Sequence, residues 1–397
     1  MRTTLEPVRF VVALVVAMSA TLVVVACGGS IEPSDLASDG GPGETTAPTD
    51  DASADGTLPV PADANAPDAR DVDSGRAPDS GATCAPCPGG CLVGARCLIT
   101  LATGQVKPGR IAVNGLGVYW TNDGVPDDSY AASAVLVVGH DGGATTTVAG
   151  RTNMALGASI DFIAVDSRRV YWVEGFHAWA ATEGGTPVAL GAWPYYAHGI
   201  TVDDTSVYLT EGSSLSGLWK LDIDGGSPVK IGSGLDDPSS PVVGGGDAFW
   251  FAYNGNGASE LYRVRLAGGA AMALPSQLPG GIFFELALGP RDVYLGSGSA
   301  LMKVDRDGGT PLSLASGYHV AGFALDAENV YFTNFPYPNT GTSVLRASLD
   351  GGAPTVLATG LPSAYKIAVD DASVYWTDRG ECDGGACTGA VMKLSPK

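Results

Sequence analysis

The chain has 397 residues, a formal net charge of −20 and a hydrophobic content of 45%. This acidic balance argues against nucleic acid or an anionic lipid surface as partner, because both require a basic footprint. The chain also lacks the G-x-S-x-G, H-E-x-x-H and phosphate-binding glycine-loop motifs that mark common enzyme classes. The function therefore has to be inferred from the organisation of the chain.

Residues 1–26 have the layout of an export signal. Two arginines precede an apolar run from Phe10 to Ala26, which ends in small residues before Cys27. The run is near the short limit for a membrane span and no stop-transfer pattern follows, which favours cleavage over a retained helix. Val24-Val25-Ala26-Cys27 resembles a bacterial lipobox, and this resemblance implies cleavage before Cys27 and its lipidation. The alternative is an ordinary secreted cysteine, which would leave an odd thiol.

An acidic linker is expected at residues 27–83. The segment is rich in Asp, Ala, Pro, Gly and Ser and nearly free of aromatic and large aliphatic residues. It cannot bury enough apolar surface to offset the entropy of ordering, and its like charges repel one another. We predict a disordered tether between the lipidated Cys27 and a folded domain. The protein is then expected in the bacterial cell envelope, at the outer membrane, and in contact with the membrane through its lipid anchor only.

Two groups of cysteines follow Cys27. They are Cys84, Cys87, Cys91 and Cys97 in a cysteine-rich segment at 84–97, and Cys382 and Cys387 in one loop near the end of the chain. The spacing C-x2-C-x3-C-x5-C in the first group is compatible with a zinc site or with disulfides. An exported chain with an even number of remaining cysteines normally oxidises them, so we expect disulfides.

A motif similar to Val-Tyr-Trp-Thr-Asp recurs seven times. Its copies begin at Val118, Val170, Val207, Phe249, Val293, Val330 and Val374. Their mean spacing of about 43 residues is that of a four-stranded β-propeller blade. The units also contain turns such as Asp350-Gly351-Gly352, which need positive φ angles, and unbroken apolar runs that are typical of strands packed on both faces. We predict an all-β, seven-bladed propeller at residues 98–397, with six blades as the alternative if the fourth unit is irregular.

The seventh unit ends at Val391–Leu394 and lacks a fourth strand. Leu98–Gly104 lies just before the first inner strand and is similar to residues 355–360, which precede the inner strand of the seventh unit. We predict that this N-terminal strand pairs beside residues 391–394, closes the ring and removes an open sheet edge. Cys97 would then lie on the closing blade, whose loop carries Cys382 and Cys387.

Three of the motifs support a family resemblance. Tyr119-Trp120-Thr121-Asn122, Tyr331-Phe332-Thr333-Asn334 and Tyr375-Trp376-Thr377-Asp378 resemble the YWTD repeats of low-density-lipoprotein-receptor-type propellers. Similar repeats occur in secreted bacterial lipoproteins, in the same broad group as TolB-like and NHL propellers. The resemblance extends from Leu98 to the end of the chain and implies a propeller fold, but it is not specific for an activity.

Polar residues end the second strand of five units, at Asn122, Glu174, Glu211, Asn334 and Asp378. These residues are candidates for an acidic ring at one mouth of the channel that could hold Ca²⁺ through oxygen ligands. The resemblance to YWTD propellers implies a structural role instead, and we expect no cofactor.

A second polar position opens the turn between the first two strands, with Asp166 and Asp203 as examples and with Gly245 and Gly289 in units four and five. Its side chain is expected to accept local backbone N–H groups.

The loops between blades, and those between the second and third strands, share one face of a propeller. Here they are rich in aromatic residues and histidines, and the candidates for ligand binding are Trp193, Tyr195, Tyr196, His198, His177, Trp179, His319, Phe335, Tyr337 and Tyr365. Exposed aromatic groups with polar rims mark binding surfaces and suit peptide side chains or sugars. The alternative is that each ring folds over its own blade.

These features predict a membrane-anchored, exported propeller that acts as a binding or interaction module for a protein, peptide or glycan ligand, and not for nucleic acid. No residue is assigned a catalytic role. The alternative is a hydrolase or lyase propeller with a carboxylate site at the channel mouth. A group of two or more buried carboxylates with a histidine in the central cavity would distinguish the enzyme from the binding module.

Overall fold

A computed structural model describes residues 86–87, 90–93, 96–124, 133–150, 160–192, 196–212, 217–233, 238–253, 259–276, 278, 283–336, 341–383 and 386–397. These residues form strands and turns, and they include no helix long and apolar enough to cross a membrane. Residues Cys84–Lys397 belong to one compact unit. The predicted signal peptide, Cys27 and the predicted linker lie outside the described residues, so what we expect of them remains a prediction.

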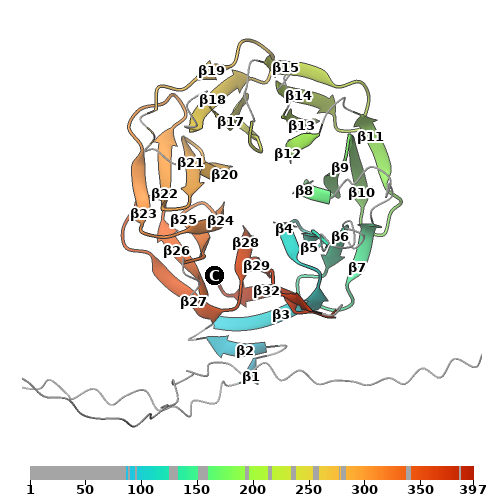
Figure 1. The fold of residues 1–397 in the computed structure, drawn as a ribbon, viewed down its shortest axis with the longest axis vertical. Coiled ribbons are helices and arrows are strands. Elements are labelled where there is room, and N and C mark those ends of the chain that lie inside the picture. Colours follow the sequence, from blue (N-terminus) through green and yellow to red (C-terminus); the bar gives the residue numbers. More distant parts are fainter. Residues whose placement is uncertain are drawn as a thin grey trace, which may run out of the picture. The chain divides into compact units, whose positions relative to one another are not determined.

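The described strands form the seven blades of a β-propeller, which confirms the predicted blade number (Figure 1). Blade 1 consists of β4 (Pro108–Val113), β5 (Val118–Asn122), β6 (Ala134–Val138) and β7 (Thr146–Gly150), and blade 2 of β8 (Ile160–Val165), β9 (Arg169–Glu174), β10 (His177–Thr182) and β11 (Val188–Ala192). Blade 3 consists of β12 (Ala197–Val202), β13 (Ser206–Glu211), β14 (Gly217–Asp222) and β15 (Val229–Ser233), and blade 4 of β16 (Val242–Gly244), β17 (Asp247–Tyr253), β18 (Ser259–Arg265) and β19 (Met272–Ala273).

The next two blades repeat this order, in which the chain runs antiparallel from the innermost strand to the outermost. Blade 5 consists of β20 (Phe283–Leu288), β21 (Asp292–Ser297), β22 (Ala300–Asp305) and β23 (Leu312–Ser316), and blade 6 of β24 (Val320–Leu325), β25 (Asn329–Asn334), β26 (Thr342–Ser348) and β27 (Thr355–Leu361). The divergent fourth unit is therefore a complete four-stranded blade, although β19 has only 2 residues.

The seventh blade joins the two ends of the domain. Its sheet contains β28 (Ala364–Val369), β29 (Val374–Asp378), β32 (Gly389–Ser395) and the N-terminal strand β3 (Arg96–Gln105). Leu98 lies opposite Leu394 and Thr100 opposite Met392, so the predicted closing strand is confirmed. β2 (Gly90–Val93) and β1 (Pro86–Cys87) continue this sheet outside β3 (Figure 1).

The Tyr-Trp pair of the repeat forms the contacts between blades. The second strand of each blade is buried on both faces, and its successive side chains point to opposite sides. Tyr119 of blade 1 therefore packs against blade 2 in a cluster with Trp172, while Trp120 packs against blade 7 in a cluster with Tyr375. Equivalent clusters of described residues lie at the other blade interfaces. The apolar repeat thus encodes the contact of each blade with both neighbours.

An aspartate and a tyrosine five residues later hold the first turn of four blades. In blade 3, Asp203 Oδ1 accepts the N–H groups of Thr205 and Ser206, both at 2.8 Å, and Oδ2 accepts the Tyr208 hydroxyl at 2.8 Å. Blades 2, 6 and 7 repeat the arrangement, which confirms the predicted structural role. In blade 4 the register places Gly244, rather than Gly245, at this position, since Val243 pairs with Ala248. The motif copy of this blade therefore begins at Ala248 and not at the predicted Phe249, and Phe249 occupies the tyrosine position.

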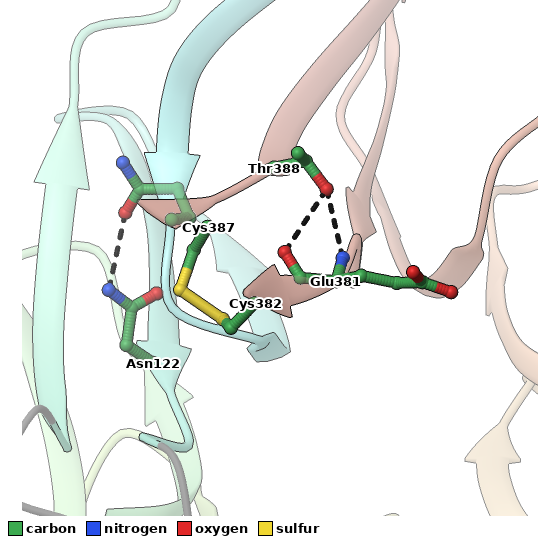
Figure 2. Close-up of a disulfide and its surroundings, with 6 residues drawn as sticks. Asn122, Glu381, Cys382, Cys387 and Thr388 are labelled. Atoms are coloured by element: carbon green, nitrogen blue, oxygen red, sulfur yellow. Dashed lines mark hydrogen bonds between the residues drawn. A yellow bond between two sulfur atoms is a disulfide. The ribbon is translucent and has the colours of Figure 1, made fainter. Parts of the chain in front are cut away.

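A disulfide joins Cys382 and Cys387 between β30 (Cys382–Asp383) and β31 (Ala386–Cys387). Figure 2 shows this hairpin, in which the Thr388 hydroxyl donates to the Glu381 carbonyl at 3.2 Å and accepts the Glu381 N–H at 2.9 Å. The disulfide and these two hydrogen bonds together close the loop that follows β29. Cys97 is also disulfide-bonded.

The oxidised state expected for these cysteines is therefore confirmed at Cys97, Cys382 and Cys387. Cys84 and the side chains of Cys87 and Cys91 lie outside the described residues, so their pairing remains a prediction. Within the described part of the chain, no group of three or more His, Cys, Asp or Glu residues is arranged to hold a metal ion.

Candidate ligand-binding site

One position of the repeat lies at the channel-facing start of the innermost strand. It lies four residues before the residue that opens the first turn of the blade, which is Asp203 in blade 3. In blade order the residues at this position are Arg110, Phe162, Gly199, Ser240, Glu285, Gly322 and Lys366. The residues with side chains at this position line two cavities. Five blades therefore present a side chain at one level of the channel, and blades 3 and 6 have glycine there.

Charged residues at this level meet across the axis. Arg110 Nη1 of blade 1 donates to Glu285 Oε1 of blade 5 at 2.7 Å, and Lys366 Nζ of blade 7 donates to the same oxygen. Lys366 Nζ also donates to the carbonyl of Ala321 in blade 6 at 2.7 Å. A single carboxylate of blade 5 thus links two cations, one from blade 1 and one from blade 7.

Gly322 makes room for this cluster. It occupies the channel-facing position of blade 6, between the strands that carry Glu285 and Lys366. A Cβ atom at Gly322 would lie 3.2 Å from both Cα and Cδ of Lys366, closer than ordinary packing allows. The missing side chain therefore lets Lys366 extend past blade 6 and reach Glu285.

The third residue of the Tyr-Trp-Thr motif fixes the strands that carry the cations. The Thr121 hydroxyl accepts the Arg110 N–H at 3.0 Å, and the Thr377 hydroxyl accepts the Lys366 N–H at 3.2 Å. Thr377 also donates to the carbonyl of Gly109 in the next blade at 2.9 Å. These threonines are buried, so they hold the inner strands where solvent does not compete.

The charge states of the cluster follow from burial and from the neighbouring charges. Burial raises the pKa of Glu285, but Arg110 and Lys366 outweigh it and bring the pKa below its usual value. Burial outweighs the opposing effect of the Glu285 carboxylate and holds the pKa of the Lys366 ammonium below its usual value. Glu285 is therefore an ionised carboxylate that is held between two cationic side chains.

A cavity of about 450 Å³ opens beside this cluster at one mouth of the channel. Its wall is mostly apolar and is lined by Arg110, Glu285, His319, Val320, Ala321, Phe335, Ser363, Tyr365, Lys366 and Arg379. His319 and Ser363 lie in connections between blades, and Phe335 and Arg379 follow second strands. The cavity thus opens on the face that carries both kinds of loop.

Tyr365 supports the cations of the cavity. The Arg379 guanidinium carbon lies 4.7 Å from the centre of the Tyr365 ring, and Lys366 Nζ lies 4.8 Å from it. Arg379 Nη1 also pairs with Asp123 Oδ2 of blade 1 at 3.0 Å. One aromatic ring therefore orients two cations at the boundary between blades 7 and 1.

The structure brings three of the predicted ligand-binding candidates together, because His319, Phe335 and Tyr365 all line this cavity. His177, Trp179, Tyr196 and His198 belong to blades 2 and 3 or the connection between them, and they do not line it. Tyr196 is 49% exposed and packs against the Phe176 ring, with centroids 4.6 Å apart. Trp193, Tyr195 and Tyr337 lie outside the described residues.

The predicted acidic ring is not gathered at either described channel cavity. Asn122, Glu174, Glu211 and Asp378 are buried, and neither they nor Asn334 line these cavities. Asn334 Oδ1 accepts the His319 N–H at 2.9 Å, and Asp378 Oδ1 accepts the Gly380 N–H at 3.3 Å. Asn334 and Asp378 thus organise loops of their own blades, whereas Asn122 of blade 1 donates from Nδ2 to Gln105 Oε1 of the closing strand β3 at 3.3 Å.

Sequence reasoning did not single out Arg110, Glu285, Lys366 or Arg379. A usable signal was present for the first three, since they interrupt the apolar inner strands at one register position. The lining of the two described channel cavities contains one carboxylate, Glu285. The paired carboxylates with a histidine that would favour the enzyme alternative are therefore not present in this lining.

No family model and no curated protein matches the chain. Among solved structures, it is similar to YCF48 bound to D1 peptide (TM-score 0.55, 9% identity, 78% of this chain and 99% of that one). It is also similar to the WD40 β-propeller domain of Doa1 (TM-score 0.52, 13% identity, 75% and 96%). A third similar structure is the β-propeller domain of the Trilobed protease from Pyrococcus furiosus (TM-score 0.54, 10% identity, 73% and 97%). At these identities the similarity shows the propeller fold alone, and the YWTD type remains a prediction.

Proposed function

We propose that this protein is an exported, lipid-anchored β-propeller that binds a peptide or a segment of another protein in the cavity at the channel mouth. One observation carries the proposal. His319 and Phe335, which come from two loops, and Tyr365, which lies near the start of β28, converge with four charged side chains on one cavity.

The composition of the cavity supports binding. Ligand sites are concave, mostly apolar and supplied with a few polar groups that orient the ligand, and a cavity of about 450 Å³ is within their usual size range. Aromatic side chains provide large contact area at low entropic cost, and they are enriched among the residues that dominate binding energy. YCF48, which has a similar fold, is bound to a peptide in its solved structure.

A screen of immobilised peptides tests this function. Wild-type protein would be compared with a Phe335→Ala/Tyr365→Ala variant and with Met272→Ala, a control that removes an exposed apolar side chain from the outermost strand of blade 4. We expect wild type and the control to bind the same peptides. The double variant should lose about 30-fold or more in affinity, which corresponds to about 2 kcal/mol.

The melting temperatures of all three proteins would be measured beside the screen. Because Phe335 and Tyr365 are only partly buried, we expect the double variant to melt within a few degrees of wild type. Equal affinity of the double variant and wild type would contradict the proposed site. Failure of wild type to bind any peptide would contradict the proposed function itself.

A further inference from the structure

We infer that the cavity selects the free C-terminal carboxylate of a peptide whose last residue is apolar. This inference rests on the proposed function and specifies the chemistry of the same site. It follows from the charge of the cavity, from the closure of its inner end and from the apolar part of its wall.

The charge of the cavity is opposite to that of the whole protein. In a chain of net charge −20, the lining contains three cations, Arg110, Lys366 and Arg379, against the single carboxylate of Glu285. The side chains of Arg110 and Arg379 are 28% and 30% exposed, whereas that of Lys366 is 10% exposed. The two guanidinium groups are thus the accessible cations, and guanidinium binds carboxylate in a bidentate manner.

The ion cluster closes the inner end of the cavity. Arg110 and Glu285 line this cavity and also the second channel cavity of about 300 Å³, which extends along blades 1 to 5. They therefore form the partition between the two spaces. An extended chain cannot pass through this partition, so a peptide that runs along the channel axis meets it with one of its ends.

The sign of the charge determines which end enters. A protonated amino terminus would be repelled by Arg110 and Arg379, whereas a C-terminal carboxylate would be attracted and could accept hydrogen bonds from both. Glu285 is shared by Arg110 and Lys366, and Asp123 pairs with Arg379, so three cationic side chains face two carboxylates. One positive charge therefore remains in excess at the cavity.

The remaining wall suits an apolar last residue. Phe335 and Val320 lie in the same lining as the cations, and the Tyr365 ring holds Arg379 and Lys366 by cation–π contacts. A peptide carboxylate bound to the guanidinium groups would place its last side chain within reach of these apolar groups. Burial of that side chain would add affinity that a carboxylate alone does not have.

The experiment uses two peptide arrays with identical sequences, in which the last two positions vary over all amino acids. One array presents free C-terminal carboxylates and the other presents C-terminal amides. We expect wild-type protein to bind free-acid peptides that end in apolar residues at least tenfold more tightly than their amides. Arg379→Gln should reduce this preference at least fivefold. The control Arg265→Gln, at an exposed residue on the outer side of blade 4, should keep it.

Arg110→Gln is the second test variant, in case Arg379→Gln alters the loop that follows β29, and it should also reduce the preference at least fivefold. Equal binding of acids and amides would overturn the inference but leave the proposed function intact. An unchanged preference in folded Arg379→Gln and Arg110→Gln would also overturn it. Phenylacetate that competes as strongly as the best peptide would assign the site to small carboxylates instead. Binding to neither array would contradict the proposed function as well.

Discussion

Each residue of the Tyr-Trp-Thr motif has a separate structural task. The tyrosine and tryptophan pack against the two neighbouring blades, as Tyr119 and Trp120 do, and the tyrosine hydroxyl closes a turn wherever an aspartate is available. Blade 4 lacks both partners of that hydrogen bond, since Gly244 replaces the aspartate and Phe249 replaces the tyrosine. Blade 5 differs, because Gly289 replaces the aspartate there while Tyr294 keeps the hydroxyl, so the hydrogen bond is not required for a blade to form.

The first prediction concerns Asp326 in blade 6. Burial alone would raise the pKa of Asp326. Hydrogen bonds from Lys397, from two backbone N–H groups and from the Tyr331 hydroxyl outweigh burial and lower the pKa to about 2. Because the folded-state pKa is below the ordinary value of 3.8, the stabilisation is complete above that value and is lost as the pH falls towards 2.

Asp326→Asn should therefore lower the free energy of unfolding by about 2 kcal/mol at pH 7, since the bonds that it weakens are made to a charged group. The difference from wild type should shrink between pH 4 and about pH 2. Urea unfolding across this pH range checks the expectation, with the exposed Asp371→Asn as control. A difference that stays constant with pH would show that the charge of Asp326 does not contribute.

The candidate site could be predicted from the sequence only in part. His319, Phe335 and Tyr365 could be predicted because propeller topology places the loops of His319 and Phe335, and the start of the strand that carries Tyr365, on one face. The ion cluster could not be predicted, because the spacing of Arg110, Glu285 and Lys366 in the sequence does not indicate which blades meet across the axis. That contact also depends on Gly322, whose missing side chain leaves the path of Lys366 open.

At the scale of elements, the apolar repeat was sufficient to predict the strands, their pairing and the closing of the ring. The motif marks the second strand of every blade, and blade 7 is recognisably incomplete without a strand from elsewhere in the chain. The continuation of the closing sheet into β2 and β1 was not predicted. These strands are short, and Gly90–Val93 follows no repeat, so neither period nor propensity marks them.

The second prediction tests the closing strand. Deletion of Leu98–Gly104 removes the partner of β32 and leaves an unpaired sheet edge in blade 7. We expect a much lower melting temperature and aggregation. Deletion of Gly28–Ala82, the predicted linker, is the control and should leave the melting temperature almost unchanged. If both deletions melt like the parent protein, the ring does not depend on this strand for its stability.

At the scale of the whole molecule, the charge of the chain and the charge of the candidate cavity differ in sign. Acidic residues outnumber basic ones by 20 charges in the full chain, which favours solubility and disfavours anionic surfaces. The accessible cations of Arg110 and Arg379 instead lie inside one cavity, where apolar walls strengthen their electrostatic interactions. Overall composition therefore gave no indication of this cavity.

The third prediction concerns the proposed anchor at Cys27, for which the lipobox resemblance and the linker composition are the basis. Cys27→Ser should remove the acylated residue and move the protein from the membrane to the soluble exported fraction. Detergent partitioning of both proteins checks this. Unchanged partitioning would mean that lipidation of Cys27 does not hold the protein at the membrane.

The most direct test of the central claim, that the ligand binds at the channel mouth, is to map where a bound peptide crosslinks. The tightest peptide from the arrays would carry a photoreactive group at its last side chain, and crosslinked residues would be identified by mass spectrometry. We predict crosslinks to residues 319–335 and 363–379, the segments that line the cavity, and their loss in the presence of excess unlabelled peptide. Crosslinks confined to the outermost strands, or to blades 2 and 3 around Tyr196, would contradict the account.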